Sequence, residues 1–175
     1  MWPFALHLHA QQVQERLIYT TLFQDWTALT ASATESVIEK PTTFSNETLA
    51  FKMKNITMAP TGWESKFSTP ATVGYARCEK TADTYIEFGP LKSVTKLSFV
   101  HCATGSNRGY KLEKKGAGDA NWVVLSQAVA NPAGGVLVSA DVNSTDVSFR
   151  FTNLTTNQYA FVTELNIWGN VSSSA

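Results

Sequence analysis

Residues 147–152, with the sequence VSFRFT, alternate strictly between apolar and polar side chains. Successive side chains of a β-strand point to opposite faces, so this stretch predicts a strand with one buried face and one solvated face. The same alternation of period two recurs in residues 95–99, 110–113 and 163–168, and further strand-like runs occupy residues 48–56, 122–125 and 136–142. The chain therefore reads as a series of half-buried strands.

Turn-forming clusters of Gly, Pro, Asn, Asp and Ser separate these runs at residues 104–109, 116–119, 131–135 and 153–157. Short strands at such spacing predict an all-β fold, an antiparallel β-sandwich of jelly-roll type. Within these elements we expect Trp26 and Trp122 to lie in the core.

The first third of the chain permits two interpretations. Ile18, Leu22, Trp26 and Leu29 follow helical spacing, so residues 14–31 could form one amphipathic helix. The alternative is a strand over residues 16–21 followed by a loop, which the β-formers of this segment favour. Periodicity alone does not decide between them.

Composition excludes several classes of function. A length of 175 residues fits one domain, and 14 basic against 14 acidic residues give a net charge of zero. That balance lacks the positive surface that duplex nucleic acid requires. The mean hydropathy is −0.11, and no apolar run approaches the roughly 20 residues that span a bilayer. We therefore expect neither nucleic-acid binding nor a membrane span.

The ends and the cysteines bear on the compartment. Residues 1–12 begin with an apolar stretch ending in a small residue, which we interpret as the remnant of an export signal. The domain would then cover residues 13–171, residues 172–175 would begin a linker, and the protein would be secreted, extracellular or periplasmic. In an exported protein the pair Cys78 and Cys102 predicts one disulfide, with two buried free thiols as the alternative.

Signatures of catalysis are absent from the sequence. There is no H-E-x-x-H, C-x-x-C, G-x-S-x-G or P-loop motif, and His101 is the one histidine beyond residue 9. We therefore predict a protein without enzymatic activity.

Two loops combine aromatic and polar side chains suited to a sugar, namely residues 57–72 and 104–109. Aromatic rings stack on the apolar faces of sugars, while a few placed polar groups bond their hydroxyls. The predicted ligand-binding residues are a stacking platform, its polar contacts and weaker candidates at strand ends, in that order: Trp63; Asn107, Arg108 and Tyr110; Tyr75, Arg77 and His101. The structural alternatives are that Trp63 caps the sandwich, that Tyr110 and His101 belong to the core, and that Arg108 is a solvated turn residue.

Three segments also carry a resemblance to known proteins: LIYTTLFQDW (17–26), the stretch from LKSVTKLSFVHC to NWVVLS (91–126), and FVTELNIWGN (161–170). The last two resemble galactose-binding-like β-sandwich modules of secreted bacterial polysaccharide-degrading enzymes. The whole chain is similar to N-terminal modules of secreted pectate-lyase-like proteins. The resemblance implies a non-catalytic carbohydrate-binding module, tethered to a catalytic domain, that binds a polysaccharide or oligosaccharide of plant cell walls or with uronate units.

Modules of this kind often carry a structural calcium, which the resemblance would place at Glu164 with Asp25 or Asn46. Because the sequence shows no cluster of carboxylates, we predict no cofactor and keep the calcium as an alternative. We expect a monomer.

Two other functions remain open from the sequence. In a small jelly-roll polysaccharide lyase, Tyr110 or His101 would abstract the proton next to a uronate carboxylate, which Arg108 would neutralise. A surface spacer or adhesion domain without a glycan site is the other alternative. The locally positive segment 108–115 would attract an acidic glycan, although its Lys–Glu–Lys alternation is also that of an ordinary solvated strand.

Overall fold

The computed structural model describes residues 12–61, 74–102, 108–130 and 135–173, and within these ranges the regular structure consists of strands without a helix. No helix that could cross a bilayer occurs in those ranges. The strands are β1 (Gln12–Thr21), β2 (Ser36–Pro41), β3 (Thr48–Lys54), β4 (Ile56–Ala59), β5 (Tyr75–Cys78), β6 (Tyr85–Cys102), β7 (Arg108–Lys115), β8 (Val123–Ala130), β9 (Val136–Asn153) and β10 (Ala160–Ser173).

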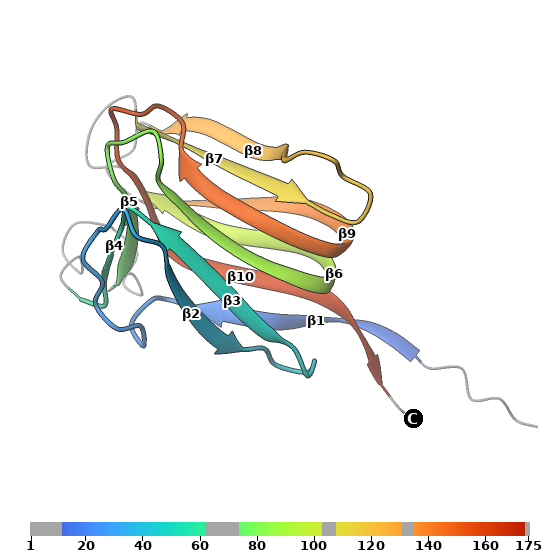
Figure 1. Ribbon diagram of the computed structural model, residues 1–175. Helices are drawn as coiled ribbons and strands as arrows, with labels where there is room; N and C mark the ends of the chain where they lie inside the picture. Colours follow the sequence, from blue (N-terminus) through green and yellow to red (C-terminus); the bar gives the residue numbers. More distant parts are fainter. Residues whose placement is uncertain (1–11, 62–73, 103–107, 131–134, 174–175) are drawn as a thin grey trace, which may run out of the picture.

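The strands form two antiparallel layers that share two long strands, β6 and β9 (Figure 1). The first sheet contains β2, β3, the first part of β6, the second part of β9, β7 and β8. The second sheet contains β4 and β5, β10 with β1 along its C-terminal part, the second part of β6 and the first part of β9. The predicted antiparallel β-sandwich is confirmed.

The long strands pass from one sheet to the other at a corner. In β6 the register with β9 shifts between Phe88 and Leu91 and again between Val94 and Lys96. Opposite this corner, Asn143 and Asp146 of β9 both adopt a positive φ of 46°. Such irregularities bend a strand sharply, which lets one strand serve both layers.

The inner faces of the two sheets form the core, as the alternation in residues 147–152 predicts. Phe149 and Phe151 are buried, whereas Arg150 between them lies on the outer face of the first sheet. The Phe149 ring stacks on Phe88 at 5.2 Å between centroids, and Phe88 stacks on Phe51 at 5.4 Å. Burial of these apolar rings provides the main stabilisation of the fold.

The N-terminal segment is a strand followed by a loop, so the helical interpretation of residues 14–31 is wrong. β1 pairs along β10 to Thr21, whose hydroxyl accepts hydrogen bonds from the Phe23 amide at 2.9 Å and the Trp26 indole at 3.1 Å. Phe23 adopts a positive φ of 60°, which ends the strand in a tight turn. Ile18 reaches the core from β1 and Trp26 from the loop, where it is buried as predicted, and Leu29 packs against the core.

The prediction of a disulfide between Cys78 and Cys102 is wrong, because both thiols are free and buried. Cys78 pairs with Ala160 and Cys102 with Phe161, on opposite sides of β10. Two strands flanking a third lie roughly 9–10 Å apart, beyond the ~7 Å that a disulfide spans. The side chains also face opposite sides of the sheet, since Cys78 belongs to the main core and Cys102 to a second apolar cluster.

Other details differ from the sequence-based prediction. The expected strand over residues 48–56 divides into β3 and β4 at Asn55, which has a positive φ of 51°. Trp122, expected in the core, is half-buried, and its indole lies 4.6 Å from the Arg150 guanidinium on the outer face of the first sheet. It comes immediately before β8, so strand alternation does not turn it inward.

Candidate functional site

Three cations surround the ring of Tyr159, which precedes β10. The guanidinium carbon of Arg77 lies 4.6 Å from the ring centroid, that of Arg108 lies 5.5 Å away, and the Lys80 ammonium lies 4.5 Å away. Cations at such distances are attracted by the negative face of an aromatic ring. These four residues and Glu79 are called the Tyr159 cluster.

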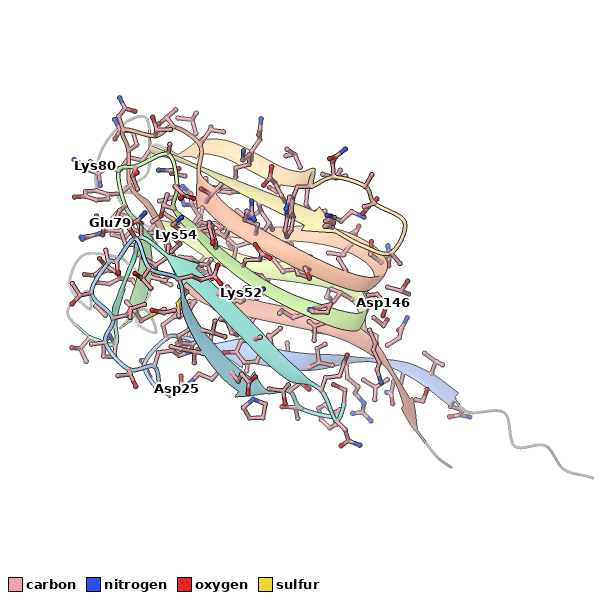
Figure 2. The ribbon with its side chains drawn as sticks, in the orientation of Figure 1. Asp25, Lys52, Lys54, Glu79, Lys80 and Asp146 are labelled. Atoms are coloured by element: carbon pink, nitrogen blue, oxygen red, sulfur yellow. The ribbon has the colours of Figure 1, made fainter. Side chains whose placement is uncertain are left out.

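The members of the cluster come from separate parts of the chain. Arg77 lies on β5, Glu79 and Lys80 follow that strand, Arg108 begins β7, and Tyr159 lies in the β9–β10 connection. Figure 2 shows Glu79 and Lys80 together at one end of the sandwich, beside β4 and β5. The sheet topology therefore assembles the cluster at one end of the molecule.

Hydrogen bonds hold Arg77 in place. Its Nε donates to Glu79 Oε1 at 2.9 Å, and its Nη2 lies 2.9 Å from the same oxygen. The Thr57 hydroxyl on the neighbouring strand β4 donates to that oxygen at 2.6 Å. Because Arg77 keeps other guanidinium donors, this pairing orients the side chain without using its full hydrogen-bonding capacity.

An apolar cluster on the same face supports the site from beneath. Strand alternation puts Tyr75 and Arg77 on the outer face of β5, in the row opposite Phe161 of β10. Phe161 packs against Tyr75 at 5.7 Å and against Tyr159 at 5.9 Å between ring centroids. Val100 and Cys102 complete this buried cluster. The Tyr159 ring is thus fixed by packing on one side while cations approach it.

The charge of the cluster determines which kind of ligand it attracts. Among the described residues it contains three cations and one carboxylate, although the chain as a whole is neutral. Guanidinium groups bind carboxylates through paired hydrogen bonds, and an ammonium adds a strong point charge. Combined with an aromatic ring, these groups suit an acidic sugar.

The predicted site residues divide into three groups. Arg77 and Arg108 belong to the Tyr159 cluster, and Tyr75 lies beneath it with 9% of its surface exposed. Trp63 and Asn107 lie outside the described residues. The sequence thus indicated two of the cations without indicating the ring between them.

Tyr110 and His101, predicted as ligand contacts, lie in the core instead, with 2% and 1% of their surfaces exposed. The Tyr110 hydroxyl lies 2.9 Å from that of Ser126, and its ring is 4.7 Å from that of His101. The pKa of His101 is lowered to about 4, because burial disfavours the charged imidazolium. Both residues support the sandwich from inside, which is the structural alternative that the alternation in β7 also allowed.

Tyr159 and Lys80 were not singled out from the sequence. Lys80 belongs to a charged turn that resembles any solvated loop, and Tyr159 stands one residue before a strand. Their neighbour in space, Arg108, is 51 residues from Tyr159 in the chain. The one local signal is an aromatic residue at the end of a turn cluster, where no alternating pattern turns it inward.

Glu164 and Asp25, which the resemblance matches to a calcium site, have other polar partners in the structure. Glu164 Oε1 accepts a hydrogen bond from Asn166 Nδ2 at 3.0 Å, and Asp25 lies 3.8 Å from the Lys40 ammonium. In the part of the chain that the structure describes, no three His, Cys, Asp or Glu side chains gather to hold a metal ion. Calcium needs six to eight oxygen ligands, and we assign it no role here.

Comparison with known proteins gives weak similarities. No protein-family model matches the chain, and no curated protein matches its sequence. The K2 cleaved adhesin domain of Lys-gingipain aligns with a TM-score of 0.44 and 11% identity, over 88% of this chain and 99% of that one. CpGH89CBM32-6, produced by Clostridium perfringens, aligns with a TM-score of 0.41 and 14% identity, over 65% of this chain and 91% of that one.

The CBM32 domain of AlyQ, solved with 4,5-unsaturated mannuronic acid, gives a TM-score of 0.39 and 17% identity, over 64% of this chain and 92% of that one. Similarities at this level carry no conclusion about activity. The function must therefore be argued from the residues of this chain.

Proposed function

We propose that this chain is a non-catalytic carbohydrate-binding module of a secreted polysaccharide-degrading protein, and that its Tyr159 cluster binds a uronate-containing glycan of the plant cell-wall type. The observation that carries the proposal is the approach of three cations to one tyrosine ring. A uronate unit presents a carboxylate for the cations and an apolar ring face for the aromatic side chain.

The proposal also rests on how the cluster is held. Arg77 is oriented by Glu79 and Thr57, and Tyr159 packs against Phe161, so these side chains need little ordering on binding. Pre-organisation of this kind reduces the entropic cost of association. The tether to a catalytic domain, the secretion and the monomeric state are parts of the same proposal and come from the sequence.

Titration calorimetry with oligogalacturonate tests the Tyr159 cluster directly. Lys80→Ala and Arg108→Ala each remove one cation near Tyr159, so each should weaken binding about three- to tenfold, since one charge-assisted contact contributes on the order of 1 kcal/mol. The double variant should weaken binding further. Lys80 is exposed, so its substitution should leave the unfolding midpoint nearly unchanged.

Lys52→Ala is the matched control, because Lys52 is an exposed lysine on β3 in the first sheet. It changes the net charge as Lys80→Ala does but leaves the Tyr159 cluster intact. Equal losses in Lys52→Ala and Lys80→Ala would show a nonspecific charge effect and would contradict the proposed site.

A lyase function has little support, because its two candidate bases, Tyr110 and His101, are buried. A general base must reach the proton that it removes. Incubation with polygalacturonate and alginate should give no rise in ultraviolet absorbance from unsaturated products. A sustained rise that is lost in Tyr110→Phe would instead favour the lyase.

A further inference from the structure

A hollow lies on the outer face of the first sheet, away from the Tyr159 ring. It is a groove of about 220 Å³. Its floor is formed by side chains of β7 and β9, and its rims by the turn 82–84 and the turn 154–156. It is lined by polar and aromatic residues that include Asp83, Tyr85, Lys111, Glu113, Arg150 and Thr152.

Arg150 in the groove floor is clamped between two aromatic rings. Its guanidinium carbon lies 4.9 Å from the Tyr85 ring centroid and 4.6 Å from that of Trp122. On the adjacent strand, Glu87 Oε2 accepts from Arg150 Nη2 at 2.8 Å and from Nε at 3.3 Å. The clamp therefore holds two aromatic side chains and one guanidinium in a defined arrangement at the surface.

Backbone contacts make the rim of the groove rigid. The side-chain amide of Asn153 is 6% exposed and donates to the carbonyl oxygens of Glu79, Thr81 and Gln158 at 2.9–3.2 Å. The Thr152 hydroxyl donates to the Thr84 carbonyl. These bonds join the turn after β5 to the end of β9, so both rims are tied to the same strand.

The charges at the groove are paired. Lys111 lies 3.5 Å from Glu113, Arg150 is bonded to Glu87, and the Asp83 carboxylate forms an ion pair with Lys54. Lys54 lies on β3, at the side of this face in Figure 2. These pairs, together with the Glu35 carboxylate that accepts a hydrogen bond from the Tyr85 hydroxyl, give the face little attraction for a polyanion but many hydrogen-bond donors and acceptors.

We propose that this groove is a second sugar-binding site, which takes a ring of a neutral oligosaccharide. Tyr85 would offer an apolar contact to the sugar, while Lys111, Glu113 and Thr152 bond its hydroxyl groups. The proposal uses none of the cations around Tyr159, so either site can fail in experiment without the other.

The test is an NMR titration of the whole chain with xylotetraose, mannotetraose and β-1,4-galactotetraose, each to about 10 mM, a range that detects millimolar affinity. At least one of these sugars should shift the amide signals of Tyr85, Lys111 and Thr152. Tyr85→Ala should weaken that binding about five- to tenfold.

Two further variants address the effect of folding. Thr156→Trp places a large side chain at the exposed rim without removing a contact, and it should abolish binding in a folded protein. Phe44→Ala is the control, because Phe44 is 59% exposed and does not line the groove. It should bind as the unaltered chain does.

The outcomes are distinct. If none of the three sugars shifts the groove signals, or if Thr156→Trp binds normally, the groove proposal is overturned. If neutral sugars shift only the Lys80 and Arg108 signals, it is overturned as well. Groove binding that persists in Lys80→Ala and Arg108→Ala supports it, whether or not those variants lose oligogalacturonate.

Discussion

At the scale of single residues, His101 is a titratable group enclosed by the fold, with 1% of its surface exposed. Its Nδ1 lies 3.3 Å from the Phe161 carbonyl oxygen, which is consistent with donation from the ring, while Nε2 has no hydrogen-bond partner among the described residues. Protonation of Nε2 would create a buried charge and a buried donor without an acceptor. Both are costly in an apolar core.

This environment makes stability depend on pH. The pKa of His101 is lowered from 6.5 to about 4 in the folded state. Between these values the unfolded chain binds the proton more readily, so stability should be full above about pH 6.5 and fall as the pH drops toward 4. The His101 contribution to this loss should be about 3 kcal/mol. Urea denaturation at a series of pH values measures it.

His101→Phe supplies the comparison for this effect, since it keeps a ring in the core and removes the titrating group. Its stability should fall less steeply between pH 6.5 and 4 than that of the unaltered chain. Parallel curves for the two proteins would mean that other groups cause the loss, which would contradict the assignment to His101.

At the scale of elements, the corner of β6 limits the size of the side chain that the neighbouring strand β10 can carry at Gly169. A Cβ atom built on Gly169 of β10 would lie 2.2 Å from the backbone oxygen of Ser93, in the corner of β6. That oxygen belongs to a bent backbone segment and cannot rotate away as a side chain would. Gly169→Ala should therefore destabilise the fold by about 1–3 kcal/mol, as overpacking does. Chemical denaturation gives this value.

Gly116→Ala is the matched control. Its added Cβ would meet its nearest neighbours at 3.4–3.5 Å, which is ordinary contact, in the turn between β7 and β8. It should change stability by less than about 0.5 kcal/mol. A similar loss in both variants would show that the effect is a general one of replacing glycine rather than the close approach at Ser93.

The strands that sequence analysis found are those with one buried and one solvated face. The second half of β9 alternates cleanly, because its side chains face the core and the solvent in turn. β2 escaped detection because it is an edge strand of half-buried and exposed side chains, and β4 because it has only four residues. Alternation over four residues is too short to separate from chance.

The candidate sites were harder to predict for a different reason. Arg108 and Arg77 were found as polar residues near loops, but Tyr159 joins them through strand pairings between distant segments. Likewise, Trp122 was assigned to the core from its neighbours, whereas the aromatic clamp on Arg150 depends on which face of β9 turns outward. Contacts across sheets are set by register, which one sequence does not display.

At the scale of the whole molecule, the two proposed sites lie on outer faces of different sheets and meet at one turn. Residues 79 and 80 of this turn belong to the Tyr159 cluster, whereas residues 82–84 form a rim of the groove. Asn153 holds this turn against β9, because its side-chain amide donates hydrogen bonds to the carbonyl oxygens of Glu79 and Thr81. A neutral chain thus carries a positive site and a balanced site side by side.

This division of charge predicts unequal responses of the two sites to salt. Screening shortens the range of electrostatic attraction from roughly 14 Å at about 0.05 M salt to roughly 4 Å at about 0.5 M. Oligogalacturonate binding depends on three cations opposed by one carboxylate, so that change should weaken it about tenfold. Binding of a neutral tetrasaccharide to the paired charges of the groove should change less than about twofold, because no net charge drives it. Calorimetry at the two salt concentrations measures both responses. Equal sensitivity of the two ligands would mean that they share one site, and the separate roles of the Tyr159 cluster and the groove would then have to be abandoned.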